Sequence, residues 1–172
     1  MMIKYIADKD HYTEVLSSCE RVKHDLWIGT SDLKDLYVGN GKNVVPFLSV
    51  IDNLLKRGVA VRLLHAKEPG DNFRTDFDKY TGLWAKLERK LCPRVHFKIV
   101  IFDCSVAYIG SANLTGAGIG MKGEEKRNFE AGILTDEPSL VDAAADHLDS
   151  VWQVYHCARC KRKDFCGDRI SI

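Results

Sequence analysis

The segment 95–103 constrains the fold of this chain more strongly than any other stretch. Its interior, Ile99-Val100-Ile101-Phe102, is apolar at consecutive positions, so both faces of a strand formed here would be apolar. Strands of this kind lie in the centre of a sheet that helices cover. Because helical and strand patterns alternate along the rest of the chain, we expect an α/β domain with a mixed β-sheet layered with helices.

The other expected elements follow from hydrophobic periodicity and from turn residues. Helices are predicted over 9–22, over 44–57 with Asn43 as the cap, Pro46 in the first turn and Gly58 as the stop, over 77–91 and over 140–155. Strands are predicted over 26–28, 59–64, 95–103, 106–109 and 129–134, with turns or loops at 39–41, 66–74 and 116–123. The glycine-rich loop 116–123 is either a loop that gates the substrate or a plain connection.

Length and charge exclude several classes of protein. The chain has 172 residues, 45% of them hydrophobic, which suits a globular domain and excludes a disordered or fibrous chain. Basic residues number 25 and acidic residues 24, so any basic surface for nucleic acid must be local. The first fifteen residues lack an apolar signal core, and no stretch approaches the about 20 apolar residues of a membrane span. We therefore expect a cytoplasmic protein.

A set of polar residues follows the central strand pattern at regular spacing. His96 and Lys98 are two residues apart, as are Ser111 and Asn113 after the next predicted strand. Residues two apart on a strand point to the same face, so these four side chains should converge. An ammonium group and neutral donors bind phosphoryl oxygens, and an imidazole attacks phosphorus or moves a proton. Ser111 has a second reading, because a serine after glycine also satisfies a turn.

The full pattern, H-x-K-x4-D-x6-G-S-x-N from His96 to Asn113, resembles the signature of the phospholipase D superfamily. Asn128-Phe129-Glu130 resembles the acidic position downstream of that signature, and the order of elements is similar over residues 27–155. The resemblance implies a phospholipase D-like domain and a phosphodiesterase or phosphatidyl-transfer reaction through a phosphohistidine, with no catalytic cofactor or metal. The family's active site uses two signatures. This chain has one, so the resemblance to small bacterial nucleases implies a homodimer.

The resemblance also implies a role for each residue. His96 of one subunit attacks phosphorus, and the partner subunit's His96 protonates the leaving oxygen and then activates water. Lys98 and Asn113 hold the phosphoryl oxygens. Glu130 accepts a hydrogen bond from an imidazole Nδ1, unless it is a surface residue or part of a structural ion pair. Asp103 points away from His96 along a regular strand, so we expect it to support the structure by pairing with a base or a backbone group.

The C-terminal residues 156–172 form a short, basic, cysteine-rich tail after a catalytic domain over residues 1–155. The spacing of Cys157, Cys160 and Cys166 suits a structural zinc ion, with His156, His147 or a cysteine of the body as a fourth ligand. Free thiols are the alternative, and an iron–sulfur cluster ranks lower because Ser150 stands where a further cysteine would be needed. Residues 157–172 hold five basic and two acidic residues, including Arg169 and Asp168, for a net charge of +3. This charge would either grip backbone phosphates or be a solvated terminus.

Three functions remain to be compared on the sequence. Cleavage of nucleic acid leads, because the signature is complete, the tail is basic and no device for membrane binding is visible. Phospholipid hydrolysis or phosphatidyl transfer is the alternative, and it would favour an exposed apolar surface. A catalytically silent module that binds nucleic acid is a third, which intact His96, Lys98 and Asn113 argue against.

Overall fold

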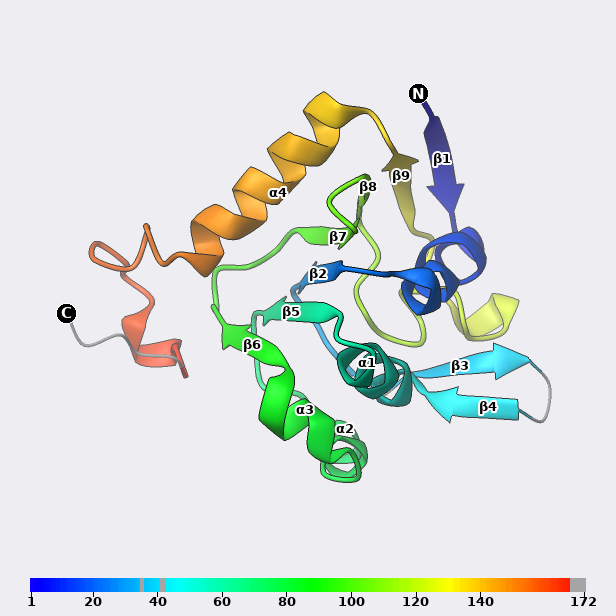
Figure 1. Ribbon diagram of the computed structural model, residues 1–172, viewed down its shortest axis with the longest axis horizontal. Helices are drawn as coiled ribbons and strands as arrows, with labels where there is room; N and C mark the ends of the chain where they lie inside the picture. The colour runs from blue at the N-terminus through cyan, green and yellow to red at the C-terminus, as the bar shows by residue number, and fades with distance from the viewer. Residues whose placement is uncertain (35, 41–42, 168–172) are drawn as a thin grey trace.

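The structure is a computed structural model, and it describes residues 1–34, 36–40 and 43–167. A seven-stranded mixed sheet runs through the middle of the molecule in the order β1-β9-β8-β7-β2-β5-β6 (Figure 1). The strands are β1 (Ile3–Ala7), β2 (Asp25–Thr30), β5 (Ala60–His65), β6 (Glu88–Leu91), β7 (Lys98–Phe102), β8 (Val106–Gly110) and β9 (Ala131–Thr135). The β2–β5 and β5–β6 pairs are parallel, and the other pairs are antiparallel.

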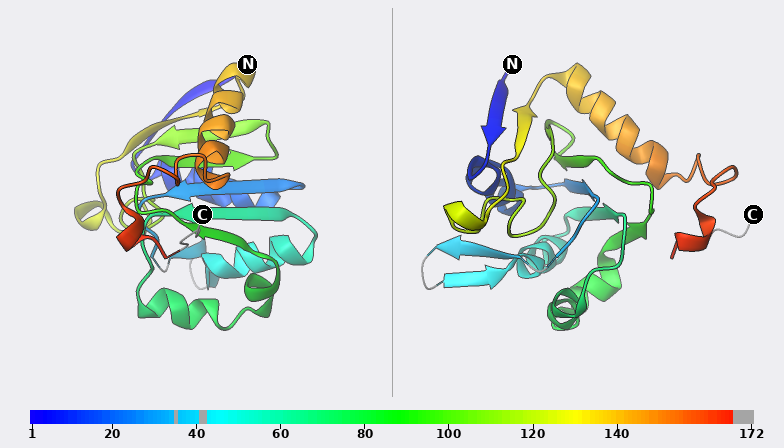
Figure 2. Two further views of the ribbon diagram at one scale, coloured as in Figure 1. Left: turned by 90° about the vertical axis from the view of Figure 1, so that its left-hand side faces the viewer. Right: turned by 180° about the vertical axis from the view of Figure 1, so that it is seen from behind.

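Helical segments cover both faces of this sheet (Figures 1 and 2). The long helix α4 (Pro138–Trp152) packs against β7 and β8 on one face. The other face carries α1 (Phe47–Lys56), α2 (Asp71–Phe77), α3 (Thr81–Lys86), a π-helical turn η1 (His11–Val15) and a 3-10 helix η2 (Leu16–Arg21). The expected α/β architecture is therefore confirmed, although the helix predicted over 9–22 is irregular.

Strand β7 shows why helices must cover both faces of the sheet. All five of its residues are buried. Val100 and Phe102 belong to the core beneath α1 and η2, whereas Ile99 and Ile101 belong to the core that includes Leu148 of α4. The prediction of a central strand that is apolar on both faces is confirmed.

A two-stranded hairpin, β3 (Tyr37–Asn40) and β4 (Asn43–Pro46), projects from the body beside α1 (Figure 1). The expectation that Asn43 caps α1 is wrong, because Asn43 begins β4 and the helix begins at Phe47, directly after Pro46. Val44 and Val45 are β-branched, and Val38 pairs with Val45 across the hairpin, which favours a strand here. Gly41 of the predicted turn lies outside the described residues.

The single helix predicted over 77–91 is also wrong. This stretch contains the end of α2, the short helix α3 and then β6, which pairs with β5 through Leu91 and His65. Tyr80 has an extended backbone and interrupts the helical run, and Trp84 is 65% exposed. Pairing along the sheet edge therefore overrides the helical spacing of the apolar residues. Helix α2 begins at Asp71, inside the predicted loop 66–74.

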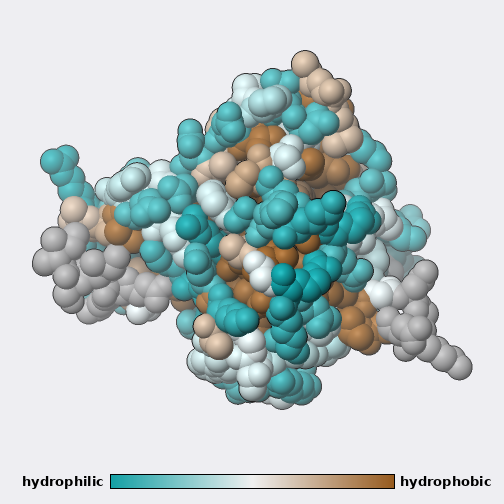
Figure 3. Space-filling view, in the orientation of Figure 1, coloured by the Kyte–Doolittle hydropathy of each residue, from teal (hydrophilic) through white to brown (hydrophobic). Residues whose placement is uncertain are grey.

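Helix α4 leads into the C-terminal tail. Arg62 of β5 lies over the Trp27 ring (4.6 Å to the centroid) and near the Trp152 ring (5.3 Å), which joins the end of α4 to the sheet. The residues after Trp152 include the 3-10 helix η4 (Lys163–Phe165) and return to β6, where the Cys166 thiol donates to the Leu91 main-chain oxygen (3.6 Å) (Figure 1). Hydrophilic side chains cover most of the face seen in Figure 3, and hydrophobic ones show toward its centre. In the described part of the chain, none of the helices is both long and apolar enough to span a bilayer.

Candidate active site

The predicted catalytic residues gather at one edge of the sheet. Antiparallel pairing sets Lys98, at the start of β7, opposite Gly110, at the end of β8, with Ser111 next along the chain. The pairing of Gly29 with Ile99 brings the end of β2 to the same edge. Strand β9 begins there too, directly after Glu130. The topology therefore places the two halves of the motif and the downstream acid side by side.

His96 and Lys98 differ in exposure. Strand β7 begins at Lys98, so His96 precedes the strand instead of lying within it, and it is exposed. Lys98 is buried, and its Nζ donates a hydrogen bond to the main-chain oxygen of His96 (2.8 Å). Burial lowers the pKa of Lys98, and the negative charge of Glu130 opposes this shift. The Lys98 ammonium is thus held next to the main-chain oxygen of His96, whose side chain is exposed.

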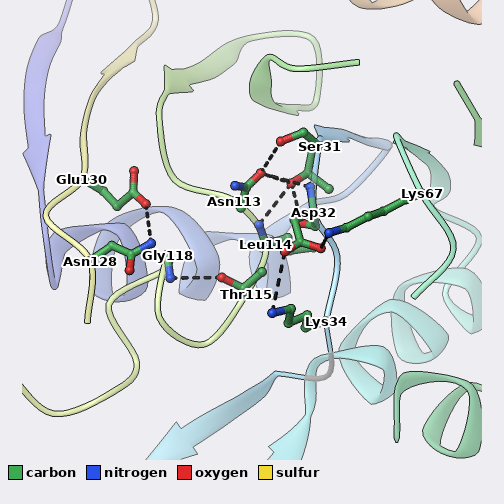
Figure 4. A network of polar contacts seen from close by, with 11 residues as sticks. Ser31, Asp32, Lys34, Lys67, Asn113, Leu114, Thr115, Gly118, Asn128 and Glu130 are labelled. Carbon is green, nitrogen blue, oxygen red and sulfur yellow. Dashed lines mark hydrogen bonds and ion pairs between the residues drawn. The ribbon is translucent and has the colours of Figure 1, made fainter. Parts of the chain in front are cut away.

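Asn113 is fixed by residues at the end of β2. Its Oδ1 accepts hydrogen bonds from Ser31 Oγ (2.8 Å), the Asp32 main-chain N–H (3.1 Å) and Thr30 Oγ1 (3.3 Å) (Figure 4). The amide nitrogen consequently points away from these partners, as a donor to a phosphoryl oxygen would. Sequence reasoning missed Thr30, Ser31 and Asp32. Their signal was a run of polar residues directly after a buried strand.

Glu130 makes its contacts with Ser111 and Asn128. Its two carboxylate oxygens accept hydrogen bonds from Ser111 Oγ and from Asn128 Nδ2 (3.0 Å). Ser111 Oγ in turn accepts from the Ala131 N–H (3.0 Å). Ser111 therefore contacts both the start of β9 and the acid, and a bond from an imidazole to Glu130 stays a prediction. Asn128 is thus a further residue that holds the Glu130 carboxylate in place.

Asp8, which sequence reasoning missed, clamps Glu130 from the end of β1. The Asp8 N–H donates to the Glu130 main-chain oxygen (3.1 Å), and Asp8 Oδ1 accepts from the Glu130 N–H (3.2 Å). Asp8 has a φ of 45°, which few residues other than glycine adopt. Gly120 packs so closely that a Cβ there would stand 2.5 Å from the Asp8 oxygen. This clamp fixes the backbone of Glu130.

Asp103 lies at the opposite end of β7. Its carboxylate accepts hydrogen bonds from the main-chain N–H groups of Lys23 (3.0 Å), His24 (2.6 Å) and Asp25 (3.1 Å). Burial acts to raise the pKa of Asp103, but these three donors outweigh it and lower the pKa overall. Asp103 thus holds the start of β2 against the β7–β8 turn, which matches the supporting role expected for it.

The glycine-rich loop 116–123 packs against the body. Ile119 is buried, and the Met121 N–H donates to the Gly116 oxygen (3.1 Å). Gly120 has a φ of 75° and lies against Asp8. These contacts favour a fixed connection over a gating loop.

The tail thiols are not arranged as a metal site. Across the described residues, no three His, Cys, Asp or Glu side chains gather as ligands for a metal ion. Cys160 accepts from the Arg162 N–H (3.4 Å), and the Cys166 thiol donates to the Leu91 oxygen (3.6 Å). As they lie here, Cys157, Cys160, Cys166 and His156 do not fit a tetrahedral zinc ion, so a zinc site would require the tail to rearrange. Asp168 and Arg169 lie outside the described residues.

Solved structures of other proteins share this fold. The chain is similar to NucT from Helicobacter pylori (TM-score 0.62, 15% identity, 88% of this chain and 97% of that one). It is also similar to Nuc, a phospholipase D family member from Salmonella typhimurium (TM-score 0.62, 18% identity, 88% and 94%). A third match is TrmBL2, an archaeal chromatin protein reported to bind DNA in a novel mode (TM-score 0.60, 14% identity, 90% and 53%).

Sequence comparison gives the family. No curated protein sequence matches the chain. The family model described as "Cardiolipin synthase, PLD-like domain" matches residues 14–152, most of the chain and all of the residues from His96 to Glu130. The chain therefore belongs to the PLD-like domain family of the phospholipase D superfamily.

Proposed function

We propose that this protein is a metal-independent phosphodiesterase that cleaves nucleic acid. The observation that carries the proposal is the hydrogen bond from the buried Lys98 ammonium to the main-chain oxygen of the exposed His96, at the same end of the central strands as Asn113. Lys98 would supply the positive charge that phosphoryl transfer needs, and the Asn113 amide nitrogen would donate to a phosphoryl oxygen. The fold shared with Nuc and NucT and the family match support this choice.

One chain supplies a single signature, so we propose that two copies form one active site. His96 Nε2 attacks phosphorus, a P–N bond forms, and the leaving oxygen takes a proton from the partner subunit's His96. Water then attacks phosphorus, the partner's His96 takes its proton, and the P–N bond breaks. The two imidazoles begin in different protonation states, one as the nucleophile and the other as the acid. Glu130, held by Asp8, would orient an imidazole of the pair.

Phospholipid hydrolysis or phosphatidyl transfer is the second candidate, because the family model carries the name of a cardiolipin synthase. The fold also matches phosphatidylserine synthase of Haemophilus influenzae (TM-score 0.60, 12% identity, 86% of this chain and 36% of that one). A silent module that binds DNA is a third, for which TrmBL2 is the relevant likeness. For the leading candidate, a nuclease, we also propose a cytoplasmic location.

The test is hydrolysis of plasmid, single-stranded DNA, RNA and phosphatidylcholine vesicles, each with a chelator present. We expect cleavage of nucleic acid, and we expect His96→Ala to lower it at least about 1,000-fold while the circular dichroism spectrum is retained. His24→Ala is the matched control, because His24 is exposed at the opposite end of the sheet. Cleavage of vesicles alone would favour the second candidate, and full activity of the folded His96→Ala variant would exclude the mechanism.

A further inference from the structure

Two lysines share one carboxylate beside the candidate active site. Lys67 Nζ lies 3.1 Å from Asp32 Oδ1, and Lys34 Nζ lies 3.8 Å from Asp32 Oδ2 (Figure 4). The side chains of Lys34 and Lys67 are 61% and 63% exposed, whereas that of Asp32 is 22% exposed. The carboxylate thus gathers two ammonium groups, and the trio carries a net positive charge toward solvent.

This trio is joined directly to the phosphate-binding side of the site. The Asp32 N–H donates to Asn113 Oδ1 (3.1 Å), and the Lys34 N–H donates to the Leu114 main-chain oxygen (3.1 Å). Leu33 and Leu114 also form a parallel β-bridge. The segment that carries the lysines therefore runs alongside Asn113, and the positions of the two cannot vary independently.

The second lysine is held by a buried histidine. His65, at the end of β5, is fully buried, and its Nε2 accepts a hydrogen bond from Arg89 Nε (2.8 Å). Since the arginine is always the donor, His65 Nδ1 carries the proton and donates to the Lys67 main-chain oxygen (2.8 Å). Arg89 also binds Glu68 (2.7 Å), the residue after Lys67. The backbone of an exposed cation is thus anchored from within the core.

We propose that Lys34 and Lys67 form a subsite for the phosphate next to the one that is cleaved, on a single strand of nucleic acid. This inference rests on the proposed function, because it takes Asn113 as the donor to the scissile phosphate. A strand carries a phosphate at every nucleotide, so when one phosphate is held at Asn113 the next needs a cation beside it. Asp32 orients the two ammonium groups. It does not itself contact the substrate.

The chemistry of this flank favours nucleic acid over lipid. A phospholipid presents acyl chains beside its phosphodiester, and these require an apolar surface next to the site. On the Asp32 side of Asn113, the surface carries the ammonium groups of two anchored lysines. Ammonium groups that bind a phosphate predict affinity that falls with salt, in proportion to the number of phosphates neutralised.

The test is binding of a fluorescent single-stranded DNA oligonucleotide, measured by anisotropy over a range of salt concentrations. All proteins carry His96→Ala to prevent cleavage. We expect Lys34→Ala/Lys67→Ala to raise Kd about tenfold and to reduce the slope of log Kd against log salt by roughly 0.7, the value for one phosphate of a single strand. The control, Lys23→Ala/Lys86→Ala, removes the same charge from exposed positions at the opposite end of the sheet and should leave both values as they are.

A third variant separates lost attraction from new repulsion. Removing both lysines leaves Asp32 unpaired, so Asp32→Asn is added to the double variant, and the weak binding should persist. Unchanged binding in the double variant, or full recovery in the triple variant, would overturn the subsite. So would lysine-dependent binding of vesicles of phosphatidylcholine and cardiolipin in place of the oligonucleotide.

A parallel experiment with intact His96 tells the two proposals apart. The ratio of kcat/KM for the oligonucleotide to that for bis(p-nitrophenyl) phosphate, which has no neighbouring phosphate, should fall about tenfold in the double variant. A ratio that does not change would count against the subsite alone. If the wild-type protein cleaves neither substrate, the proposed function fails and the subsite fails with it, and lysine-dependent binding of the oligonucleotide would then show only that the two lysines bind nucleic acid.

Discussion

Lys98 Nζ donates a hydrogen bond to the main-chain oxygen of His96, 2.8 Å away. The two residues are the H and the K of the signature, and the bond joins the buried ammonium of Lys98 to the backbone of the exposed His96. In a regular strand, the side chains of residues two apart point to the same face, and neither bonds to the main chain of the other. Here the strand begins at Lys98, so His96 lies outside it, and its main-chain oxygen is within hydrogen-bond distance of the ammonium.

Replacing Lys98 with methionine should separate catalysis from stability. Methionine is similar in length and lacks the charge, and burial already lowers the pKa of Lys98 by disfavouring its charged form. We therefore expect Lys98→Met to lower kcat at least about 100-fold and to change the free energy of unfolding by less than about 1 kcal/mol. Lys86→Met, at an exposed position, is the control. Loss of folding in the Lys98 variant, or retention of full turnover, would contradict this account.

Asp8 should act on turnover through Glu130. Asp8→Ala removes the acceptor for the Glu130 N–H and places alanine at a positive φ, so we expect about a tenfold fall in kcat and a loss of about 1 kcal/mol in stability. Asp8→Asn keeps an acceptor and tolerates this φ, so it should retain most of both. Asp10→Ala, two residues away and exposed, is the control. The prediction fails if the asparagine and alanine variants lose kcat equally, or if only KM changes.

Asp103 should contribute to stability in a way that depends on pH. Its pKa in the folded protein lies below its ordinary value of 3.8, so its contribution is present above about pH 4 and is lost as pH falls through the folded pKa. We expect Asp103→Asn to lower the free energy of unfolding at pH 7 by about 1–3 kcal/mol. Urea unfolding at several pH values should show this difference shrinking below about pH 4. Asp146→Ala, exposed on α4, should show no such trend.

Chelation should spare the chemical step. Lys98 and the partner subunit's Lys98 would supply the positive charge, so EDTA should leave the rate of cleavage unaltered. Loss of activity that Mg²⁺ restores would contradict a metal-independent mechanism.

The zinc hypothesis for the tail predicts about one zinc per chain in protein purified without added metal. Metal-free protein with freely reactive Cys157, Cys160 and Cys166 would reject that hypothesis and leave the catalytic proposal standing.

The sequence predicts those parts of the fold that have a strong local pattern. The apolar run 99–102 indicates a strand buried on both faces, and the structure confirms it. Strand β1 gives no such signal, because Ile6 is its only buried residue and its place is set by pairing with β9. The same holds for β6, where Leu91 follows a helical spacing but pairs with β5. Contacts between distant segments decide both cases.

The candidate site likewise contains residues that the sequence reveals and residues that only the fold brings together. His96, Lys98 and Asn113 lie in one continuous motif, which spacing alone makes visible. Asp8 and Asp32 support Glu130 and Asn113 from segments about 120 and 80 residues away in sequence. No local pattern links those pairs, and only the order of strands in the sheet brings them together.

The central claim is that His96 from each of two subunits serves one active site. Mixing wild-type protein with an excess of folded His96→Ala protein, under conditions where subunits exchange, tests it directly. If both imidazoles are required, activity per total chain should follow the square of the wild-type fraction, and the mass in solution should be that of a dimer. Activity that falls in simple proportion to the wild-type fraction, or a fully active monomer, would contradict the account.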